Sequence, residues 1–337
     1  MKHKFSKYLF QRILQFVVVV FTGITITFII PRLAPMDPVE TAIQRASSRN
    51  SQASYPEEVK QIRAALTELY GLQGSLPEQY WRFWKRMLKG DLGPAFSAFP
   101  TPVMVLIRRS LPYTAGLLMS SAIIAWALGN LLGGLAGYFN QRKWSQALGL
   151  LSMTITPIPY YIMAFVLLII FTFVWPLFPS GGALDIGVNP EWSVKTIVSL
   201  LYHALLPALS LVIVGVGGWF LGMRSLVSNL VAEDFVVYAE TAGVPGRRIL
   251  SRYIIRNALL PQVTGLAMQL GLIFNGAIIT EYVYSYPGLG YLYYTAIFRG
   301  DYSLTIGIAL FSIVGVALTV LVIDLTYPLF DPRVRYQ

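Results

Sequence analysis

Six stretches of the chain contain no Asp, Glu, Lys or Arg, and each is long enough to cross a membrane. They are residues 13–31, 110–141, 144–184, 196–223, 257–280 and 302–323. Crossing the hydrocarbon core takes about 20 consecutive apolar residues in a helix, so each stretch predicts a transmembrane helix. The longest stretch contains four prolines that bracket a single span, namely Pro157, Pro159, Pro176 and Pro179. The pattern therefore predicts six transmembrane helices and an all-α fold.

The polar segments between these stretches predict the orientation of the chain. Lysine and arginine in short loops stay on the cytoplasmic side of a membrane. Basic residues of the N-terminal segment, the loop at Arg142 and Lys143, the 224–256 loop and the C-terminal tail all fall on one side of the six predicted spans. Both termini are then cytoplasmic. The expected parts are 1–31, the cytoplasmic N-terminus and first helix; 32–109, an external region with a small helical cap at 40–68; 110–330, a five-helix core with the cytoplasmic 224–256 loop; and 331–337, a cytoplasmic tail.

Composition supports a membrane protein and limits its chemistry. Of the 337 residues, 55% are hydrophobic and 12% are charged, and the mean hydropathy is +0.59. A soluble domain of this size is far less apolar. The net charge of +10 comes from basic residues that flank the apolar stretches, so we expect contacts with membrane lipid and none with nucleic acid. The absence of cysteine excludes disulfides, thiol nucleophiles and cysteine metal sites.

Residues 231–261 form the one long polar interruption in the C-terminal half of the chain. Glu233 and Asp234 are acids of the kind favoured at a helix N-terminus. Gly243 stands where a helix often ends in a left-handed residue. Pro245 can then open a second helix, because the N–H that it lacks would have no partner in a first turn. The segment therefore predicts a helix, a sharp turn and a second helix.

The predicted turn offers a surface to another protein. Phe235 and Tyr238 are side chains that can anchor in a groove. Ala239, Ala242 and Gly243 are small, so a neighbouring surface can approach the backbone closely. The alternative is that the segment is an ordinary amphipathic connector between two membrane helices.

Several motifs, taken in chain order, resemble one family of membrane transporters. They are R-L-A-P-M-D-P after the first span, Y-G-L at 70–72, G-D-L-G-P-A-F at 90–96, H-A-L-L-P-A-L-S-L at 203–211, the glycine at 243 followed by N-A-L-x-P at 257–261, E-x-V-x-x-x-P-G-L-G from Glu281, and D-P-R-x-R near the end. Together they resemble the permeases of binding-protein-dependent ABC importers, in the oligopeptide/dipeptide form. Val237 and Tyr238 depart from the general EAA pattern of these permeases, and Ala239 matches it.

This resemblance implies a type I importer permease fold with six transmembrane helices and an external insertion after helix one. Such a permease forms half of a translocation pathway in the cell (inner) membrane. The implied partners are a second homologous permease, two cytoplasmic ATPase subunits that bind ATP and magnesium, and an extracytoplasmic substrate-binding protein. The positions implied in ATPase coupling are Asp234, Phe235, Tyr238, Ala239, Glu240, Ala242, Gly243 and Pro245. Peptides, oligosaccharides and nickel chelates all stay open as substrates.

Residues inside the spans predict close packing at one place and a pathway at others. Gly129, Gly133 and Gly137 recur at one-turn spacing, a ridge that lets two helices approach closely in lipid. Prolines in a membrane helix free backbone carbonyls that protein or a water-filled cavity must satisfy, although a simple kink is the alternative reading. Glu281 either faces the substrate or caps local structure. The candidate pathway residues are Pro157, Pro159, Tyr160, Gln269, Asn275 and Glu281.

The chain carries no motif for catalysis of its own. It has no G-x-x-x-x-G-K-[ST] phosphate loop and no G-x-S-x-G elbow, so we expect neither an enzyme nor a bound cofactor. One rival is a stand-alone secondary transporter, which needs carboxylates within the spans or an internal repeat, and neither is visible. A second rival is a membrane-embedded hydrolase that depends on His203. We expect that histidine to make hydrogen bonds near the outer interface instead.

Overall fold

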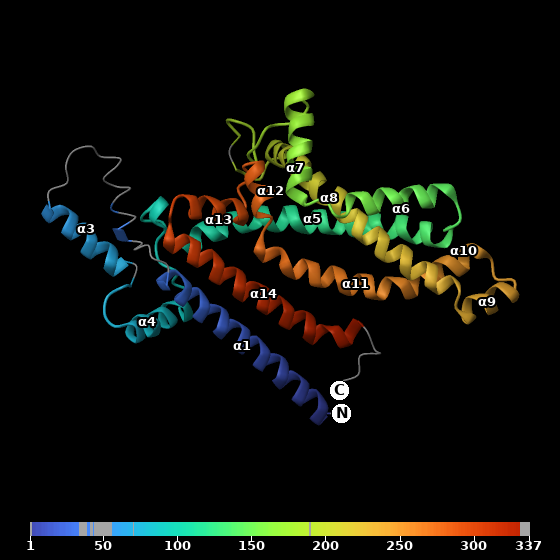
Figure 1. The fold of residues 1–337 in the computed structure, drawn as a ribbon, viewed down its shortest axis with the longest axis horizontal. Helices are drawn as coiled ribbons and strands as arrows, with labels where there is room; N and C mark the ends of the chain where they lie inside the picture. Colours follow the sequence, from blue (N-terminus) through green and yellow to red (C-terminus); the bar gives the residue numbers. More distant parts are fainter. Residues whose placement is uncertain are drawn as a thin grey trace.

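The protein is described by a computed structural model that covers residues 2–33, 39–40, 43, 56–69, 71–188 and 190–330 (Figure 1). The named elements of these residues are all helical. In chain order they are α1 (Lys2–Leu33), α3 (Pro56–Leu69), α4 (Leu76–Leu88), η1 (Phe96–Ala98), α5 (Val103–Tyr138), α6 (Lys143–Ile155), α7 (Tyr160–Leu168), the π-helical η2 (Ile169–Val174), α8 (Val194–Val231), α9 (Asp234–Thr241), α10 (Gly246–Arg248), the π-helical η3 (Ile249–Ile255), α11 (Arg256–Gly271), η4 (Leu272–Asn275), α12 (Ile278–Val283), α13 (Leu289–Phe298) and α14 (Tyr302–Phe330). The predicted tail, 331–337, lies outside the described residues.

The bundle is built around the contact between α5 and α8, the most extensive between any two elements. The predicted glycine ridge of α5 makes this contact. A Cβ at Gly129 would stand 2.4 Å from the Cβ of Trp219, one at Gly133 2.5 Å from a carbonyl oxygen of α8, and one at Gly137 2.7 Å from another. A side chain at any of these positions would force the helices apart, so the prediction of close packing is confirmed.

Among the described residues, five helices are long and apolar enough to cross a membrane. They are Lys7–Ile30, Val103–Tyr138, Val194–Val231, Gly246–Phe274 and Tyr302–Thr326. A sixth span is formed when α6 and the segment Tyr160–Val174 are counted together, although they meet at a bend of 97°. The predicted number of six spans agrees with this count.

Between the two pairs of prolines, one helical segment runs from Tyr160 to Val174, as predicted. The expectation that residues 144–184 contain only this helix is wrong, because α6 lies in the same stretch and precedes the bend. Pro157 and Pro159 lack the N–H groups that would continue α6, and a proline also disfavours helical geometry in the residue before it. Pro159 is the N-cap of α7. The bend lies against the middle of α8, where a Cβ at Gly217 would stand 2.5 Å from Thr156 Oγ1.

Three predicted helix ends also differ from the structure. α8 does not stop at Arg224 but continues to Val231, and the Arg224 guanidinium lies against Gly149 of α6. No glycine or proline interrupts residues 224–231. The basic helix after Gly243 is the first part of the Gly246–Phe274 span, not a separate loop helix. The fifth span ends at η4, because Gly276 takes a positive φ of +68° and breaks the chain before α12.

Candidate functional site

The helix α9 and the turn at Gly243 have the predicted conformation. Gly243 has φ +77°, the left-handed geometry expected from the sequence. The Gly243 N–H donates to the Glu240 carbonyl at 2.9 Å, and the Val244 N–H donates to the Ala239 carbonyl at 3.0 Å. These two hydrogen bonds form the motif that closes a helix C-terminus around a glycine. Pro245 was predicted to be the first helical residue of the second helix, but it is the N-cap of α10, one position before the first helical residue, Gly246.

One face of α9 is part of the protein core. Val236 is fully buried and Ala239 is 7% exposed. They belong to a cluster of buried residues drawn from α8, α9, η3 and α11, whose other members are Met223, Val227, Ile249, Ile254 and Ala258. Ala239 therefore lies beneath the surface, and its predicted place among the contact residues is wrong.

The opposite face of α9 and the turn are exposed. Tyr238 is 73% exposed and Phe235 is 38% exposed. The remaining predicted residues of this surface are also exposed, namely Asp234, Glu240, Ala242, Gly243 and Pro245. Beside Phe235 lies a cavity of about 480 Å³ between the end of α8, α9 and the start of α11, lined by Leu226, Asn229, Leu230, Glu233, Phe235, Asn257 and Ala258. We call this exposed set and its cavity the α9 surface.

The pathway candidates lie on several different elements of the fold. Pro157, Pro159 and Tyr160 lie together at the bend between α6 and α7, where all three are exposed. Gln269 is half-buried on α11, and the side chain of Asn275 lies outside the described part of the chain.

Glu281 is a capping residue. It is fully buried, and its carboxylate accepts hydrogen bonds from the Gly290 N–H at 2.8 Å, the Tyr291 N–H at 3.1 Å and the Thr114 hydroxyl at 2.8 Å. The Thr114 oxygen in turn accepts from the Leu289 N–H at 2.7 Å. The first three N–H groups of α13 are thus satisfied by two side chains. Burial raises the pKa of the Glu281 carboxyl, and these hydrogen bonds oppose that rise. Of the two readings open from the sequence, the structure supports the local cap.

The sequence reasoning missed a buried polar group where α5 and α11 meet. The Trp126 indole N–H donates to the Gln262 carbonyl at 3.0 Å, and the Asn130 amide donates to the Trp126 carbonyl at 2.7 Å. The side-chain oxygens of Asn130 and Gln262 are buried without a hydrogen-bond partner among the described residues. An amide side chain inside a charge-free span was the available signal, because such groups face protein or a pore instead of lipid.

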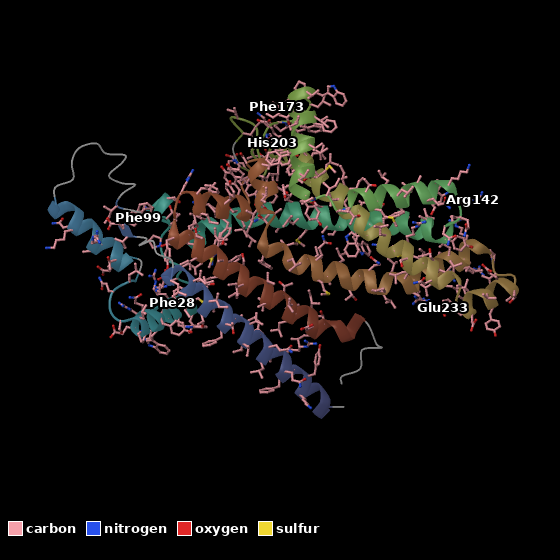
Figure 2. The ribbon with its side chains drawn as sticks, in the orientation of Figure 1. Phe28, Phe99, Arg142, Phe173, His203 and Glu233 are labelled. Carbon is pink, nitrogen blue, oxygen red and sulfur yellow. The ribbon has the colours of Figure 1, made fainter. Side chains whose placement is uncertain are left out.

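His203 makes a hydrogen bond, as expected, and no serine hydroxyl is bonded to its ring among the described residues. Its Nδ1 lies 2.9 Å from the Ser199 backbone carbonyl, and its Nε2 lies 3.9 Å from a carboxylate oxygen of Asp185. The Ser199 hydroxyl accepts a hydrogen bond from the Asp185 N–H at 2.8 Å. Figure 2 shows His203 beside the loop that precedes α8. This arrangement ties the loop to the helix and gives no support to a hydrolase.

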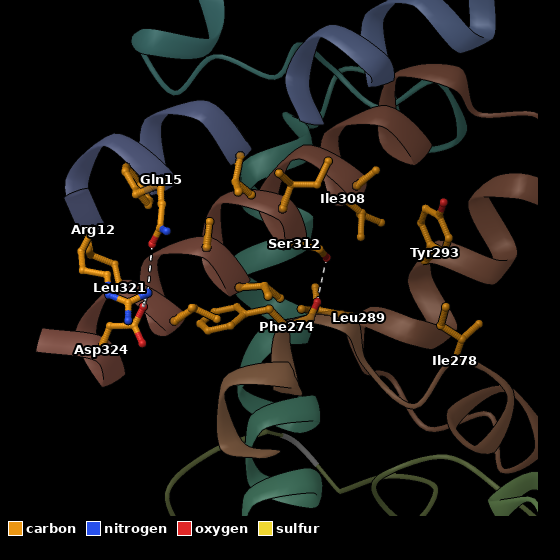
Figure 3. A pocket seen from close by; sticks show the side chains of 17 residues that line it. Arg12, Gln15, Phe274, Ile278, Leu289, Tyr293, Ile308, Ser312, Leu321 and Asp324 are labelled. Atoms are coloured by element: carbon orange, nitrogen blue, oxygen red, sulfur yellow. Dashed lines mark hydrogen bonds and ion pairs between the residues drawn. The ribbon is translucent and has the colours of Figure 1, made fainter. Parts of the chain in front are cut away.

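A larger cavity of about 890 Å³ lies between α1 and α14 and extends to η4 and α13 (Figure 3). An ion pair between Arg12 and Asp324, at 3.2 Å, is part of its lining. Apolar side chains such as Phe274, Ile308 and Leu321 make up most of the remaining lining. Such a lining suits hydrocarbon better than a hydrated, charged peptide.

Comparison with known proteins identifies the family. Residues 129–336, more than half of the chain, match the model of the binding-protein-dependent transport system inner membrane component. The chain is 30% identical over 333 residues to the oligopeptide transport system permease protein OppB of Haemophilus influenzae, with 98% of this chain and 99% of that protein covered.

Two further relatives are similar over nearly their whole length. The probable D,D-dipeptide transport system permease protein DdpB of Escherichia coli is 30% identical, with 96% of each chain covered. The oligopeptide transport system permease protein AppB of Bacillus subtilis is 28% identical, with 98% of this chain and 100% of that protein covered. With its apolar spans, the chain therefore belongs to the family of binding-protein-dependent inner membrane transport components, as a non-catalytic, multi-pass permease subunit of an ABC importer.

Proposed function

We propose that the chain forms half of the pathway of an ATP-driven importer for oligopeptides or dipeptides, and that the α9 surface receives the motion of cytoplasmic ATPase subunits. The peptide substrate is supported by the names of the relatives, which refer to oligopeptides and a D,D-dipeptide. The coupling role is supported most directly by one observation. An exposed aromatic pair, Phe235 and Tyr238, lies on a short helix whose other face is part of the core.

The proposed orientation puts the α9 surface in the cytoplasm. Arg142 and Glu233 lie at the same end of the molecule, and Phe99 lies at the other (Figure 2). The short loop at Arg142 and Lys143 is basic, and basic short loops stay in the cytoplasm. Both termini would then be cytoplasmic, while α3 and α4 would be external.

The packing of α9 provides a route for mechanical coupling. Val236 packs with Met223 and Val227 of α8 and with Ile249 of η3. A displacement of α9 would therefore move α8 and the Gly246–Phe274 span together, because close-packed interiors transmit strain. Rigid-body rocking of this kind alternates access to a site between two halves of a transporter. The other half would be a second homologous permease, and an extracytoplasmic binding protein would deliver the peptide.

A pair of alanine variants tests this proposal. In Tyr238→Ala, the loss of an exposed aromatic anchor should weaken binding of the ATPase subunits by about 2 kcal/mol, or about 30-fold. The matched control is Trp192→Ala, because Trp192 is fully exposed in the loop before α8. We expect Tyr238→Ala to lose ATPase co-purification and peptide uptake at an unchanged membrane level, and Trp192→Ala to keep both. Full co-purification and uptake with Tyr238→Ala would refute the role of the α9 surface.

A further inference from the structure

The amphipathic helix α4 packs against α1 at a depth inside the membrane span. The rings of Phe21 and Trp84 stack with centroids 5.5 Å apart, and the hydroxyls of Thr25 and Tyr80 are 2.7 Å apart. Phe21 lies nine residues before Ile30, the last residue of the apolar span of α1. At a rise of 1.5 Å per residue, this is about 13 Å below the end of the span. Part of α4 is therefore level with lipid and not with bulk water.

The rest of the described chain covers only part of the apolar side of α4. Tyr80 and Phe83 lie inward, each with its ring centroid within 5.5 Å of that of Phe28. Trp81 and Leu88 remain 63% and 78% exposed. These two are seven residues apart, so they lie on the same side of the helix, two turns from one another. Their side chains form an exposed apolar edge beside the inward-facing side chains of Tyr80 and Phe83.

The remaining side of α4 is basic. Arg82, Lys85 and Lys89 are exposed there. The Lys85 ammonium lies 5.5 Å from the centre of the Trp81 ring. Glu78 is the one acid in residues 76–89. A helix with tryptophan and leucine on one side and lysine and arginine on the other is typical of segments that lie in the plane of a membrane interface.

We propose that α4 is an interfacial helix whose partner is the phospholipid surface. Trp81 and Leu88 contact the glycerol and upper acyl region, while Lys85 and Lys89 face the phosphates. The helix thereby fixes the depth of α1, to which its inner side is packed. That this leaflet is the outer one rests on the proposed orientation, whereas the contact with lipid does not.

Nitroxide labels on single cysteines test this inference, since the chain has no cysteine of its own. The labels are placed in Trp81→Cys and Leu88→Cys in the assembled transporter, reconstituted into vesicles of phosphatidylethanolamine and phosphatidylglycerol. Collisions of each label with oxygen, which concentrates in hydrocarbon, are compared with collisions with a water-soluble nickel chelate. Val18→Cys, at an exposed position within the α1 span, is the lipid reference. Glu68→Cys, at an exposed position of α3, is the aqueous reference.

The expected ratio of oxygen to nickel collisions at both α4 positions exceeds that of Glu68→Cys and approaches that of Val18→Cys. A ratio equal to that of Glu68→Cys would show that this edge faces water and would overturn the inference. Exclusion of both reagents would show that another protein subunit covers the edge and would overturn it equally. Each collision ratio is compared with that of a reference label on the same chain. The result therefore does not depend on whether the transporter imports peptide.

Discussion

Replacing Gly243 tests whether the left-handed turn after α9 is needed for coupling. A Cβ built at this position has no atom within 4 Å, so the substitution causes no steric clash inside the chain. The cost of Gly243→Ala is therefore conformational. An L-residue in the left-handed region costs about 1–2 kcal/mol. That energy changes the balance between the native turn and rearranged turns by a factor of about 5–30.

The chain contains a matched control at the end of α4. Gly90 has φ +70° and no atom within 4 Å of its built Cβ. Its N–H donates to the Met87 carbonyl at 2.9 Å, and the Asp91 N–H donates to the Arg86 carbonyl at 3.0 Å, which is the same pair of bonds as at Gly243. Gly90→Ala therefore has the same local cost in the region proposed to be external.

The assay is peptide uptake and ATP hydrolysis stimulated by the loaded binding protein, measured on the reconstituted transporter. We expect Gly243→Ala to reduce both strongly at an unchanged protein level, and Gly90→Ala to reduce neither. Gly243→Asn should be milder than Gly243→Ala, because asparagine tolerates left-handed geometry although it is larger. Gly243→Val should be the most severe. A loss that follows side-chain size, with asparagine worse than alanine, would refute the conformational reasoning, and wild-type coupling in Gly243→Val would refute the role of the turn.

Three further predictions concern packing, capping and nucleotide. Gly133→Ala puts a Cβ 2.5 Å from a carbonyl oxygen of α8, and overpacking of about 1–3 kcal/mol should lower the thermal unfolding midpoint. Gly116→Ala on the same helix meets no atom within 4 Å and should leave that midpoint unchanged, so equal midpoints for the two variants would contradict the packing. Glu281→Leu leaves the N–H groups of Gly290 and Tyr291 without their acceptor and should destabilise the chain by about 1–3 kcal/mol for each bond left unmade; an unshifted unfolding midpoint would argue against the cap. The purified chain alone should show no ATP binding by titration calorimetry, and micromolar affinity would disprove this.

Much of the fold follows from the distribution of charge, because a charged residue inside a lipid-facing helix is costly. The same criterion places helix ends poorly. It stops the fourth span at Arg224, although backbone hydrogen bonding continues to Val231 and α6 accommodates the guanidinium. It also reads residues 144–184 as one unit, because the stretch is apolar on both sides of Pro157 and Pro159. A bend of 97° depends on how α6 and α7 pack, which hydropathy does not record.

The conformation of the turn after α9 was easier to predict from the sequence than the face of α9 that is exposed. Gly243 could be identified because few other residues adopt its backbone geometry without strain. Which side of α9 faces outward depends on contacts with α8 and η3, elements that the sequence does not place beside it. Ala239 was therefore assigned to the surface although it is buried. Similarly, the bonds of Glu281 reach Thr114 and the start of α13, and only the folded chain brings these together.

Cross-linking from the α9 surface tests the coupling role most directly. Tyr238→Cys in the otherwise cysteine-free chain is combined with a short thiol-to-amine cross-linker in membranes that contain the whole transporter. Trp192→Cys, at a fully exposed loop position, is the control. The account predicts a cross-linked product between Tyr238→Cys and an ATPase subunit, with a yield that changes when ATP is added, and none from Trp192→Cys. An ATPase that co-purifies with the transporter yet gives no product from Tyr238→Cys, or that cross-links to Trp192→Cys instead, would contradict it.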